Sequence, residues 1–200
     1  MTDFLRIALP LYFVVYFSVA IFAKSFVVAK HIGKNPLVFP SDDTAYGLIG
    51  IYFKITLAIA FVYVLVYAFL PSIYIYFLPM AYLNKELVSY VGLVFMLLSF
   101  IWTVLAQSHM KNSWRIGIDS DTKTELITIG LFSISRNPIF LGMIVTLAGL
   151  FLTTPNALTL LIFILGTILI QVQVRLEEEY LTKQHGQEYL TYKHNVRRFL

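Results

Sequence analysis

The amino-acid sequence alternates between long apolar runs and shorter polar segments. The apolar runs cover residues 7–28, 46–70, 87–106, 139–152 and 158–174. Each of the first three is near the ~20 residues that a helix needs to cross the hydrocarbon core of a bilayer. The fourth run would extend only about 21 Å at ~1.5 Å per residue. The pattern predicts an all-α, polytopic membrane protein with about five transmembrane helices, of which the fourth is short.

A brief polar break separates the last two runs. It reads Thr153-Thr154-Pro155-Asn156, a composition typical of a tight turn. We therefore expect the last two runs to form a helical hairpin whose ends lie on the same side of the membrane.

The polar residues after Val174 continue a helical pattern. Gln173, Glu177 and Gln184 fall on one helix face together with apolar positions, so the last membrane helix is expected to extend beyond the apolar run. His185-Gly186 predicts the end of this helix. Residues 187–196 then predict a short amphipathic helix, which gives the chain a helical C-terminal tail.

The composition agrees with a membrane location. Hydrophobic residues make up 58% of the chain and charged residues 13%, against about 25% charged residues in typical soluble domains. Mean hydropathy is +0.77. Cysteine is absent, which excludes disulfides and thiolate metal sites. The histidines show no metal-pair spacing, and no basic and aromatic pattern suggests nucleic acid, so we expect neither partner; the bilayer is the expected one.

The loop charges predict an orientation. Basic residues collect in the loops on one side, and the opposite side has only Arg6 and Lys85. The positive-inside rule then places the N-terminus outside and the long loop and the tail in the cytoplasm. Any chemistry of the polar segments would therefore be cytoplasmic. The basic residues on that side are Lys30, Lys34, Lys111, Arg115, Lys123, Arg136, Arg175, Lys183, Lys193, Arg197 and Arg198.

Arg136-Asn137-Pro138 stands at the entrance of the fourth apolar run. One interpretation is a capped helix start, with Pro138 in the first turn, Asn137 as the cap and Arg136 reaching to lipid phosphates. The other is that Arg136 and the exposed backbone N–H groups bind an anionic group. A charge at a membrane boundary costs free energy, which favours a functional role.

Three further features have both a structural and a functional interpretation. Glu177-Glu178-Glu179 is either a solvated face or a source of carboxylates that accept hydrogen bonds from a ribose or an ammonium group. Lys54 either snorkels to the membrane surface or serves a substrate. Gly117 either serves a turn or lets the backbone approach a ligand.

The polar residues of the second half form an ordered set. They comprise Gly130, Phe132, Arg136, Asn137, Pro138, Phe140 and Gly142, then Glu177-Glu178, then Gly186, Tyr189, Tyr192, Val196 and Arg198. This set resembles the isoprenylcysteine carboxyl methyltransferase family and the related phospholipid methyltransferases, whose pattern is Gly-x-Tyr-x-x-x-Arg-His-Pro-x-Tyr-x-Gly, a hairpin, Glu-Glu and a Gly-x-x-Tyr-x-x-Tyr-x-x-x-Val-x-Arg tail. The resemblance covers about residues 113–199.

The resemblance implies a five-helix membrane enzyme with a single domain over residues 1–200. Residues 1–106 would supply three membrane helices, and residues 107–200 the cofactor-binding half. S-adenosylmethionine would bind in a cytoplasmic pocket and leave as S-adenosylhomocysteine, and a lipophilic methyl acceptor would enter from the bilayer. The implied cofactor residues are Gly117, Thr124, Glu125, Leu126, Ile127, Phe132, Asn137, Pro138, Ile139, Phe140 and Glu177.

The same resemblance implies that Arg136 anchors the pocket or neutralises a carboxylate. If the acceptor is an amine, a base must take a proton, and Glu178 or His109 is a candidate, so Arg136 and Glu178 are the catalytic candidates. Gln173, Arg175 and Lys54 are candidates for binding the acceptor. Asn137 replaces the histidine of the family pattern, Phe132 and Phe140 replace two tyrosines, and Gln173 stands where an arginine tied to the prenylcysteine substrate is common.

The most specific hypothesis is carboxyl methylation of an isoprenylcysteine-like substrate. One alternative is N- or S-methylation of a phospholipid or a small molecule. Another is a non-enzymatic membrane protein that retains the fold.

Overall fold

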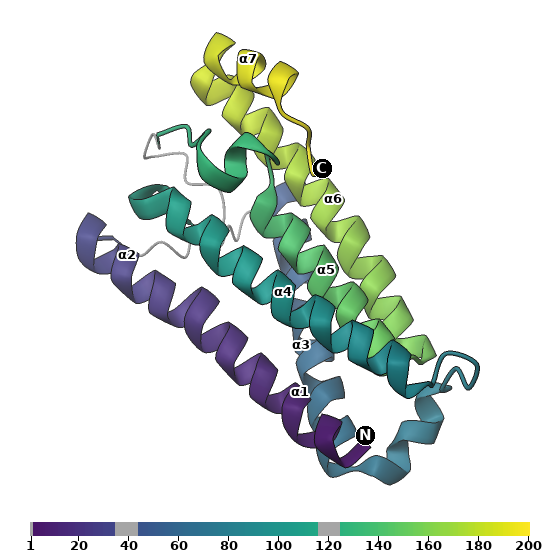
Figure 1. The fold of residues 1–200 in the computed structure, drawn as a ribbon. Coiled ribbons are helices and arrows are strands. Elements are labelled where there is room, and N and C mark those ends of the chain that lie inside the picture. Colours follow the sequence, from purple (N-terminus) through teal and green to yellow (C-terminus); the bar gives the residue numbers. More distant parts are fainter. Residues whose placement is uncertain (1, 35–43, 116–124) are drawn as a thin grey trace.

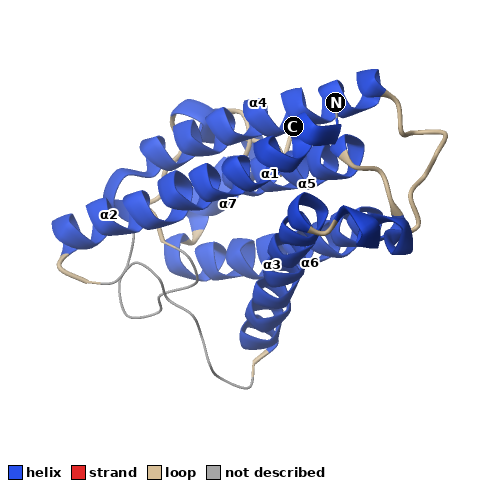
Figure 2. Cartoon of the chain, turned by 90° about the horizontal axis from the view of Figure 1, so that it is seen from below, coloured by secondary structure: helices blue, strands red, loops and turns tan. Residues whose placement is uncertain are grey.

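The computed structural model describes residues 2–34, 44–115 and 125–200. Within these ranges the chain forms seven α-helices joined by loops and short helical turns (Figures 1 and 2). The all-α prediction is therefore confirmed for the described residues. The helices are α1 (Thr2–Phe17), α2 (Lys24–Ile32), α3 (Ala45–Phe69), α4 (Glu86–Met110), α5 (Pro138–Thr153), α6 (Ala157–His185) and α7 (Gln187–Asn195).

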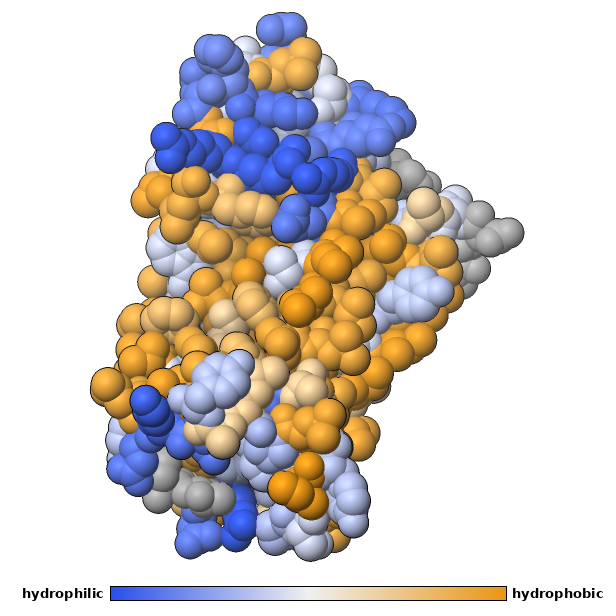
Figure 3. Space-filling view, turned by 90° about the vertical axis from the view of Figure 1, so that its right-hand side faces the viewer, coloured by the Kyte–Doolittle hydropathy of each residue, from blue (hydrophilic) through white to orange (hydrophobic). Residues whose placement is uncertain are grey.

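Four helical stretches of the described chain are long and apolar enough to cross a membrane. They are Asp3–His31, Ala45–Phe69, Glu86–Met110 and Ala157–His185, and α5 is a shorter apolar helix. The sequence predicted this set, including the short fourth helix. Figure 3 shows a broad hydrophobic band between two hydrophilic ends. Many large apolar side chains on α1, α3 and α4 are exposed, as expected for helices that face lipid.

The first membrane stretch contains a local distortion. Between α1 and α2 the segment Ser18–Ala23 is π-helical. A π-helix shifts the register of the backbone hydrogen bonds. The Gln107 side chain of α4 donates a hydrogen bond to the Ala20 carbonyl, 2.9 Å away. This buried contact fastens α4 to the first helix at the distorted turn.

Helices α4 and α5 form the closest helix pair of the bundle, and small residues allow the approach. A Cβ atom at Gly142 would collide with the Thr103 hydroxyl, and one at Gly149 would lie 2.6 Å from Met96 Cγ. Small residues at membrane-helix interfaces let the backbones approach. The Trp102 indole also donates a hydrogen bond to the Pro138 carbonyl, 2.8 Å away. The start of α5 is therefore fixed against α4.

The predicted hairpin is formed by α5 and α6, and the turn lies where the sequence indicated. Asn156 caps α6 by accepting a hydrogen bond from the Thr159 N–H, 3.0 Å away. Its side-chain amide also donates to the Tyr63 hydroxyl of α3 at 2.9 Å. The turn is thus fixed locally by the cap and globally by α3.

The C-terminal tail also follows the prediction. Helix α6 ends at His185, Gly186 has a positive φ of 56°, and α7 follows from Gln187 to Asn195. Gly186 permits this backbone conformation without a Cβ clash. After α7 the chain turns back toward α5 and α6 (Figure 1). This return path places the last residues beside the start of α5.

Candidate active site

Glu178 is a buried acceptor of hydrogen bonds from three residues. Its side chain is 3% exposed. Arg136 donates to Oε1 from Nε at 3.2 Å and from Nη2 at 3.0 Å. Arg198 donates from Nε to Oε1 at 3.1 Å and from Nη2 to Oε2 at 2.8 Å. Asn137 Nδ2 donates to Oε1 at 3.2 Å. A buried carboxylate requires such compensation for its lost hydration.

The same arginine also holds the returning tail. Arg136 Nη1 donates to the carbonyls of Lys193 and Val196, at 2.8 and 2.5 Å. Its backbone N–H donates to the Arg197 carbonyl at 2.9 Å. We call Arg136, Asn137, Glu178 and Arg198 the tail clasp. The clasp joins three segments that are far apart in sequence: the start of α5, the end of α6 and the residues after α7.

Asn137 occupies the cap position of α5 but does not act as the cap that its residue type suggests. Its side chain makes no capping hydrogen bond. Instead Nδ2 donates to Glu178 and to the Arg198 carbonyl, the latter at 3.2 Å. The interpretation of Asn137 as a side-chain cap is therefore wrong, because its amide is oriented so that Nδ2 meets the buried carboxylate. The expectation for Pro138 is confirmed, since it lies in the first turn of α5.

Two tyrosines of α7 complete the tail contact. The Tyr192 hydroxyl donates to the Phe132 carbonyl at 2.6 Å, and its ring meets that of Tyr189 edge to face. Burial raises the pKa of Tyr192 to about 12 and also raises the pKa of Tyr189. Hydrogen bonding to Glu178 raises the pKa of Arg198. At neutral pH both phenols are therefore protonated and Arg198 is charged.

Glu177 faces a different environment from its neighbour. It is partly buried, and Gln173 Nε2 donates to its Oε1 at 2.9 Å. The same nitrogen donates to the Tyr46 hydroxyl of α3 at 3.1 Å. The predicted common face of Gln173 and Glu177 is thus confirmed. Tyr46 was not predicted, since nothing in the sequence pattern links the start of α3 to α6.

An apolar cavity of about 60 Å³ lies farther along this face of α6. Gly166 and Ile170 line it from α6, and aromatic side chains such as Tyr12 and Phe53 line it from α1 and α3. Ile170, Gln173 and Glu177 are spaced i, i+3 and i+7, so they share one side of the helix. At ~1.5 Å per residue, Gln173 therefore lies about 4.5 Å along the helix from Ile170 at the cavity, and Glu177 about 10 Å.

The other expected cofactor residues are partly assembled around the start of α5. Phe132, Asn137 and Pro138 are buried, Ile139 and Phe140 are partly buried, and all five lie in the short stretch that carries Arg136. Before this stretch Leu126 and Ile127 are partly buried and Glu125 is exposed. Gly117 and Thr124 lie outside the described residues.

The remaining candidates for acceptor binding, Arg175 and Lys54, are both exposed. Arg175 is exposed and donates to the Gln171 carbonyl, 2.7 Å away. It therefore does not take the place of the family arginine at Gln173. Lys54 is exposed on α3. Glu179 is exposed and forms an ion pair with Lys183 at 2.7 Å, which fits the solvated interpretation for this one glutamate.

Metal chemistry has no obvious site in this part of the chain. Across the described ranges no group of three or more histidine, aspartate or glutamate side chains is placed to hold a metal ion. Near the clasp, Glu178 and Glu177 instead accept hydrogen bonds from arginine and amide donors.

The family assignment follows from the sequence of this same region. The sequence model of the family described as phospholipid methyltransferase matches residues 87–188, just over half of the 200-residue chain. The chain belongs to this family. The match confirms the resemblance and begins earlier than the motifs did, so that it includes α4. No curated protein is significantly similar in sequence to the chain.

Family membership makes the chain a membrane methyltransferase, and the methyltransferases of this family use S-adenosylmethionine. The matched region contains Arg136, Asn137 and the Glu177-Glu178 pair and ends before the last residues of the tail. Arg198 therefore lies beyond the match, although it makes a bidentate contact with Glu178. The sequence marked Arg198 as part of the tail pattern but did not predict this role.

Proposed function

We propose that the clasp end of the bundle binds S-adenosylmethionine and transfers its methyl group to a lipophilic acceptor. The proposal rests on the different surroundings of two adjacent glutamates, Glu177 and Glu178. Glu178 is enclosed by Arg136 and Arg198. Glu177, about 100° round the helix, lies on the face that continues to the apolar cavity. Glu178 therefore holds the three segments together, while the adjacent Glu177 carboxylate remains available to a ligand.

The available residues fit the cofactor. S-adenosylmethionine carries a sulfonium, an ammonium group and ribose hydroxyls, all of which are attracted to or donate to a carboxylate. Glu177 is partly buried and has one amide donor in Gln173, which leaves acceptor capacity. At the start of α5, Ile139 and Phe140 are partly buried and would offer apolar surface to the cofactor. Glu125, Leu126, Ile127 and the start of α5 complete the proposed set.

Within this proposal the cofactor supplies an electrophilic methyl group on a positively charged sulfur. The chain supplies alignment, because an in-line displacement needs the nucleophile and the methyl group held in register. Arg136 and Glu178 are saturated with each other and with tail contacts. We therefore assign both a positioning role in place of the catalytic role that the motif suggested.

The apolar cavity supports a lipophilic acceptor. Its lining comes from α1, α3, α5 and α6, and a chain lying there would direct its polar end along α6 toward Gln173. The carboxylate of an isoprenylcysteine-like molecule is the acceptor that the motif suggests most specifically. Such an acceptor needs no base, because the carboxylate is already a nucleophile.

A phospholipid amine is the second candidate, and one observation favours it. Gln173 is neutral and hydrogen-bonded to Glu177, so this end of the cavity presents a carboxylate without a cation on the same helix face. A negative site attracts an ammonium head group and repels a carboxylate. An amine must lose a proton before it attacks. Glu177 is the carboxylate positioned for that step when the acceptor is an amine.

The membrane orientation belongs to the same proposal. The basic loops flank the clasp end of the bundle, so the positive-inside rule places this end, with α7, in the cytoplasm and the N-terminus outside. The surface at that end, seen at the top of Figure 3, is hydrophilic, as expected for a solvated membrane face.

Calorimetric titration of the detergent-purified chain with S-adenosylmethionine and S-adenosylhomocysteine tests the proposal. Saturable binding that is lost in Glu177→Gln and retained in Glu179→Gln is the expected result. Glu179 is a matched control because it belongs to the same run of glutamates but is exposed. Absence of binding to folded protein would contradict the proposal and support a non-enzymatic protein that retains the fold.

A labelled methyl donor then identifies the acceptor. Transfer to an S-prenylated cysteine analogue would support carboxyl methylation, and transfer to phosphatidylethanolamine would support N-methylation. Gln173→Arg adds a cation beside Glu177 and is expected to shift preference toward the carboxylate acceptor. An unchanged ratio between the two acceptors would remove Gln173 from the acceptor site.

A further inference from the structure

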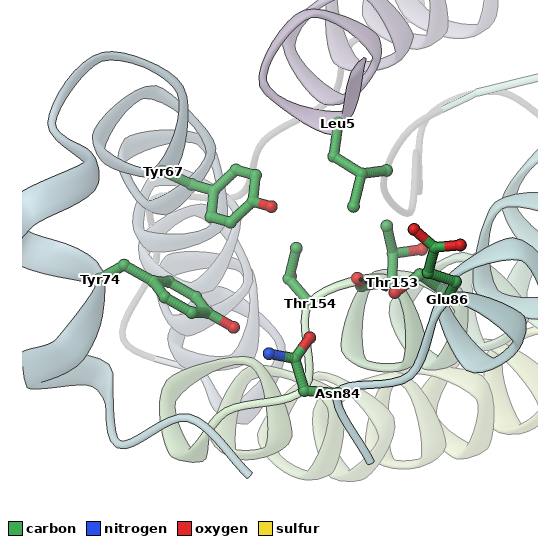
Figure 4. Close-up of a pocket in the computed structure, with 8 residues that line it drawn as sticks. Leu5, Tyr67, Tyr74, Asn84, Glu86, Thr153 and Thr154 are labelled. Carbon is green, nitrogen blue, oxygen red and sulfur yellow. Dashed lines mark hydrogen bonds between the residues drawn. The ribbon is translucent and has the colours of Figure 1, made fainter. Parts of the chain in front are cut away.

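A second, polar cavity lies at the opposite end of the bundle from the clasp. Its volume is about 280 Å³, and its lining includes Tyr67 at the end of α3, Glu86 at the start of α4 and Thr154 just after α5 (Figure 4). From Ala157 to Glu178 helix α6 rises about 30 Å at ~1.5 Å per residue. That distance matches the hydrocarbon thickness of a bilayer. The cavity therefore belongs to the other membrane face.

The walls of this cavity are buried and its mouth is polar. Leu5, Ser89, Thr153 and Thr154 are each less than 6% exposed, whereas Asn84 and Glu86 are exposed. In Figure 4 the hydroxyls of Tyr67 and Tyr74 and the amide of Asn84 point toward the same space, with the Glu86 carboxylate at its edge. A ligand could therefore enter from the membrane surface and meet polar groups inside.

The small hydroxyl groups in the wall are committed as donors. Ser89 Oγ donates to the Thr153 carbonyl at 3.0 Å, and Thr153 Oγ1 donates to the Gly149 carbonyl at 2.7 Å. Thr154 Oγ1 donates to the Leu150 carbonyl at 3.2 Å. Because a hydroxyl has a single hydrogen to donate, each can offer a ligand only its acceptor lone pairs. This part of the wall therefore matches a ligand that donates hydrogen bonds.

A buried tyrosine whose hydroxyl opens into the cavity adds an independent indication of a ligand. Tyr67 is 6% exposed and its ring meets that of Tyr74 edge to face, with centroids 5.4 Å apart. Among the residues that the structure describes, its hydroxyl has no hydrogen-bond partner, and neither has the Glu86 carboxylate. Buried polar groups are normally hydrogen-bonded. The Tyr67 hydroxyl instead faces the cavity, where a ligand can satisfy it.

We propose that this cavity is a binding site for a primary ammonium group, with Glu86 as its counter-ion and the Tyr67 hydroxyl and the threonine oxygens as acceptors. Glu86 is the charged residue of the lining. Arg6 and Asp3 also lie near Tyr67 but form an ion pair with each other at 2.9 Å, which leaves the Glu86 carboxylate as the counter-ion for a ligand. Tyrosine rings also attract cations through their faces. A quaternary ammonium fits less well, because it has no hydrogen to donate to the acceptor wall.

Two sources can supply such a group at a membrane surface. One is the head group of an ethanolamine or serine phospholipid in the leaflet opposite the clasp, and the other is a soluble amine. Lys85, next to Glu86 in sequence, is exposed and is available to a lipid phosphate. The site is separate from methyl transfer, and its occupant would contribute to how the bundle is held in that leaflet.

Native mass spectrometry of the full chain tests the lipid source, and ligand-observed NMR with ethanolamine tests the soluble source. Phosphatidylethanolamine retention is compared with phosphatidylcholine, and ethanolamine with choline. Glu86→Gln is expected to weaken primary-amine binding about tenfold or more, since it removes a charge-assisted contact. Tyr67→Phe is expected to weaken it about threefold, and the exposed control Glu188→Gln to leave it unchanged.

The outcomes distinguish a lipid from a soluble amine as the ligand, and this cavity from the proposed cofactor site at the clasp end. If the parent protein retains one phosphatidylethanolamine that Glu86→Gln loses, and neither protein binds ethanolamine, the site is assigned to a lipid. If the parent protein also binds ethanolamine and Glu86→Gln loses this binding, the site is assigned to soluble amines as well. Either supports the proposal if the loss persists in a Glu177→Gln background. Equal binding of choline compounds, or binding that Glu86→Gln and Tyr67→Phe leave unchanged, would overturn it. Binding of S-adenosylmethionine by Glu86→Gln is an independent measure of its fold.

Discussion

The carboxylate of Glu178 and the guanidinium of Arg136 form a buried ion pair at 3.0 Å between residues 42 positions apart. Their side chains are 3% and 8% exposed. The pair connects the end of α6 with the entrance of α5, and Arg198 brings the returning tail to the same carboxylate. A buried pair of this kind contributes less to net stability than to fixing one arrangement of three segments.

Breaking the clasp is expected to destabilise the protein. Glu178→Gln leaves two arginines without their carboxylate, and removal of one partner of a buried ion pair costs about 3–5 kcal/mol. The melting temperature in detergent should fall by roughly 10 °C. Limited proteolysis should then cleave the tail after α7 faster than in the parent protein.

The neighbouring Glu179→Gln is the control for this loss. Its ion pair with Lys183 is exposed, and exposed pairs of this kind add little to stability. The double variant Arg136→Gln/Glu178→Gln should recover part of the stability, because no buried charge of that pair remains unpaired. A melting temperature in Glu178→Gln equal to that of Glu179→Gln would show that the clasp does not hold the tail.

Glu177→Gln is expected to behave in the opposite way from Glu178→Gln. The amide oxygen can still accept from Gln173, which keeps its own hydrogen bond to Tyr46, so the melting temperature should change by no more than a few degrees. Affinity for S-adenosylmethionine should fall at least about tenfold through loss of a charge-assisted contact. Calorimetry and thermal unfolding on the same samples distinguish the two glutamates, and retained affinity would remove Glu177 from the cofactor site.

Gly142→Ala is expected to separate α4 from α5. The new methyl group would collide with the Thr103 hydroxyl, and overpacking of this kind costs about 1–3 kcal/mol. Thermal unfolding measures the loss. The double variant Gly142→Ala/Thr103→Ala removes the colliding oxygen and should recover stability; failure to recover it would place the strain elsewhere.

The tail contact should weaken at alkaline pH. Burial raises the pKa of Tyr192 from 10.0 to about 12, so the folded protein favours the neutral phenol. The stability from this tyrosine is therefore complete below about pH 10 and is lost as the pH rises through about 12. Difference absorbance between the parent protein and Tyr192→Phe isolates this phenolate. A transition at the ordinary value would mean that Tyr192 is not buried against Phe132.

The proposed orientation can be tested by single thiols, because the chain has no cysteine. Glu188 on α7 and Tyr82 between α3 and α4 are both exposed. A membrane-impermeant maleimide should label Glu188→Cys from the cytoplasmic side and Tyr82→Cys from the opposite side. Vesicles of the two orientations provide the comparison, and the reversed pattern would invert the topology.

The sequence predicted the local elements well for a simple physical reason. The extent of α3, α4 and α5 follows from runs of apolar residues ended by polar or turn-forming ones, which are properties of adjacent positions. Gly186 and Pro138 mark helix boundaries through their own backbone preferences. The Gln173–Glu177 contact follows from helical periodicity alone.

Contacts between segments that are far apart in the sequence could not be predicted from such local properties. One interpretation of the sequence made Asn137 the cap of its own helix, yet its Nδ2 donates to Glu178, because a buried carboxylate from α6 is a strong acceptor that needs hydrogen-bond donors. Tyr46 meets Gln173 only through the packing of α3 against α6.

By itself the sequence determined a helical membrane protein, the positions of its helices and, through the ordered motifs, its methyltransferase family. The tertiary structure decided that Glu178 is enclosed while Glu177 is available, and that Arg198 returns to the entrance of α5. The physical reason is range: apolar length and turn chemistry act between neighbouring residues, whereas the partner of a buried charge is chosen by the packing of whole helices.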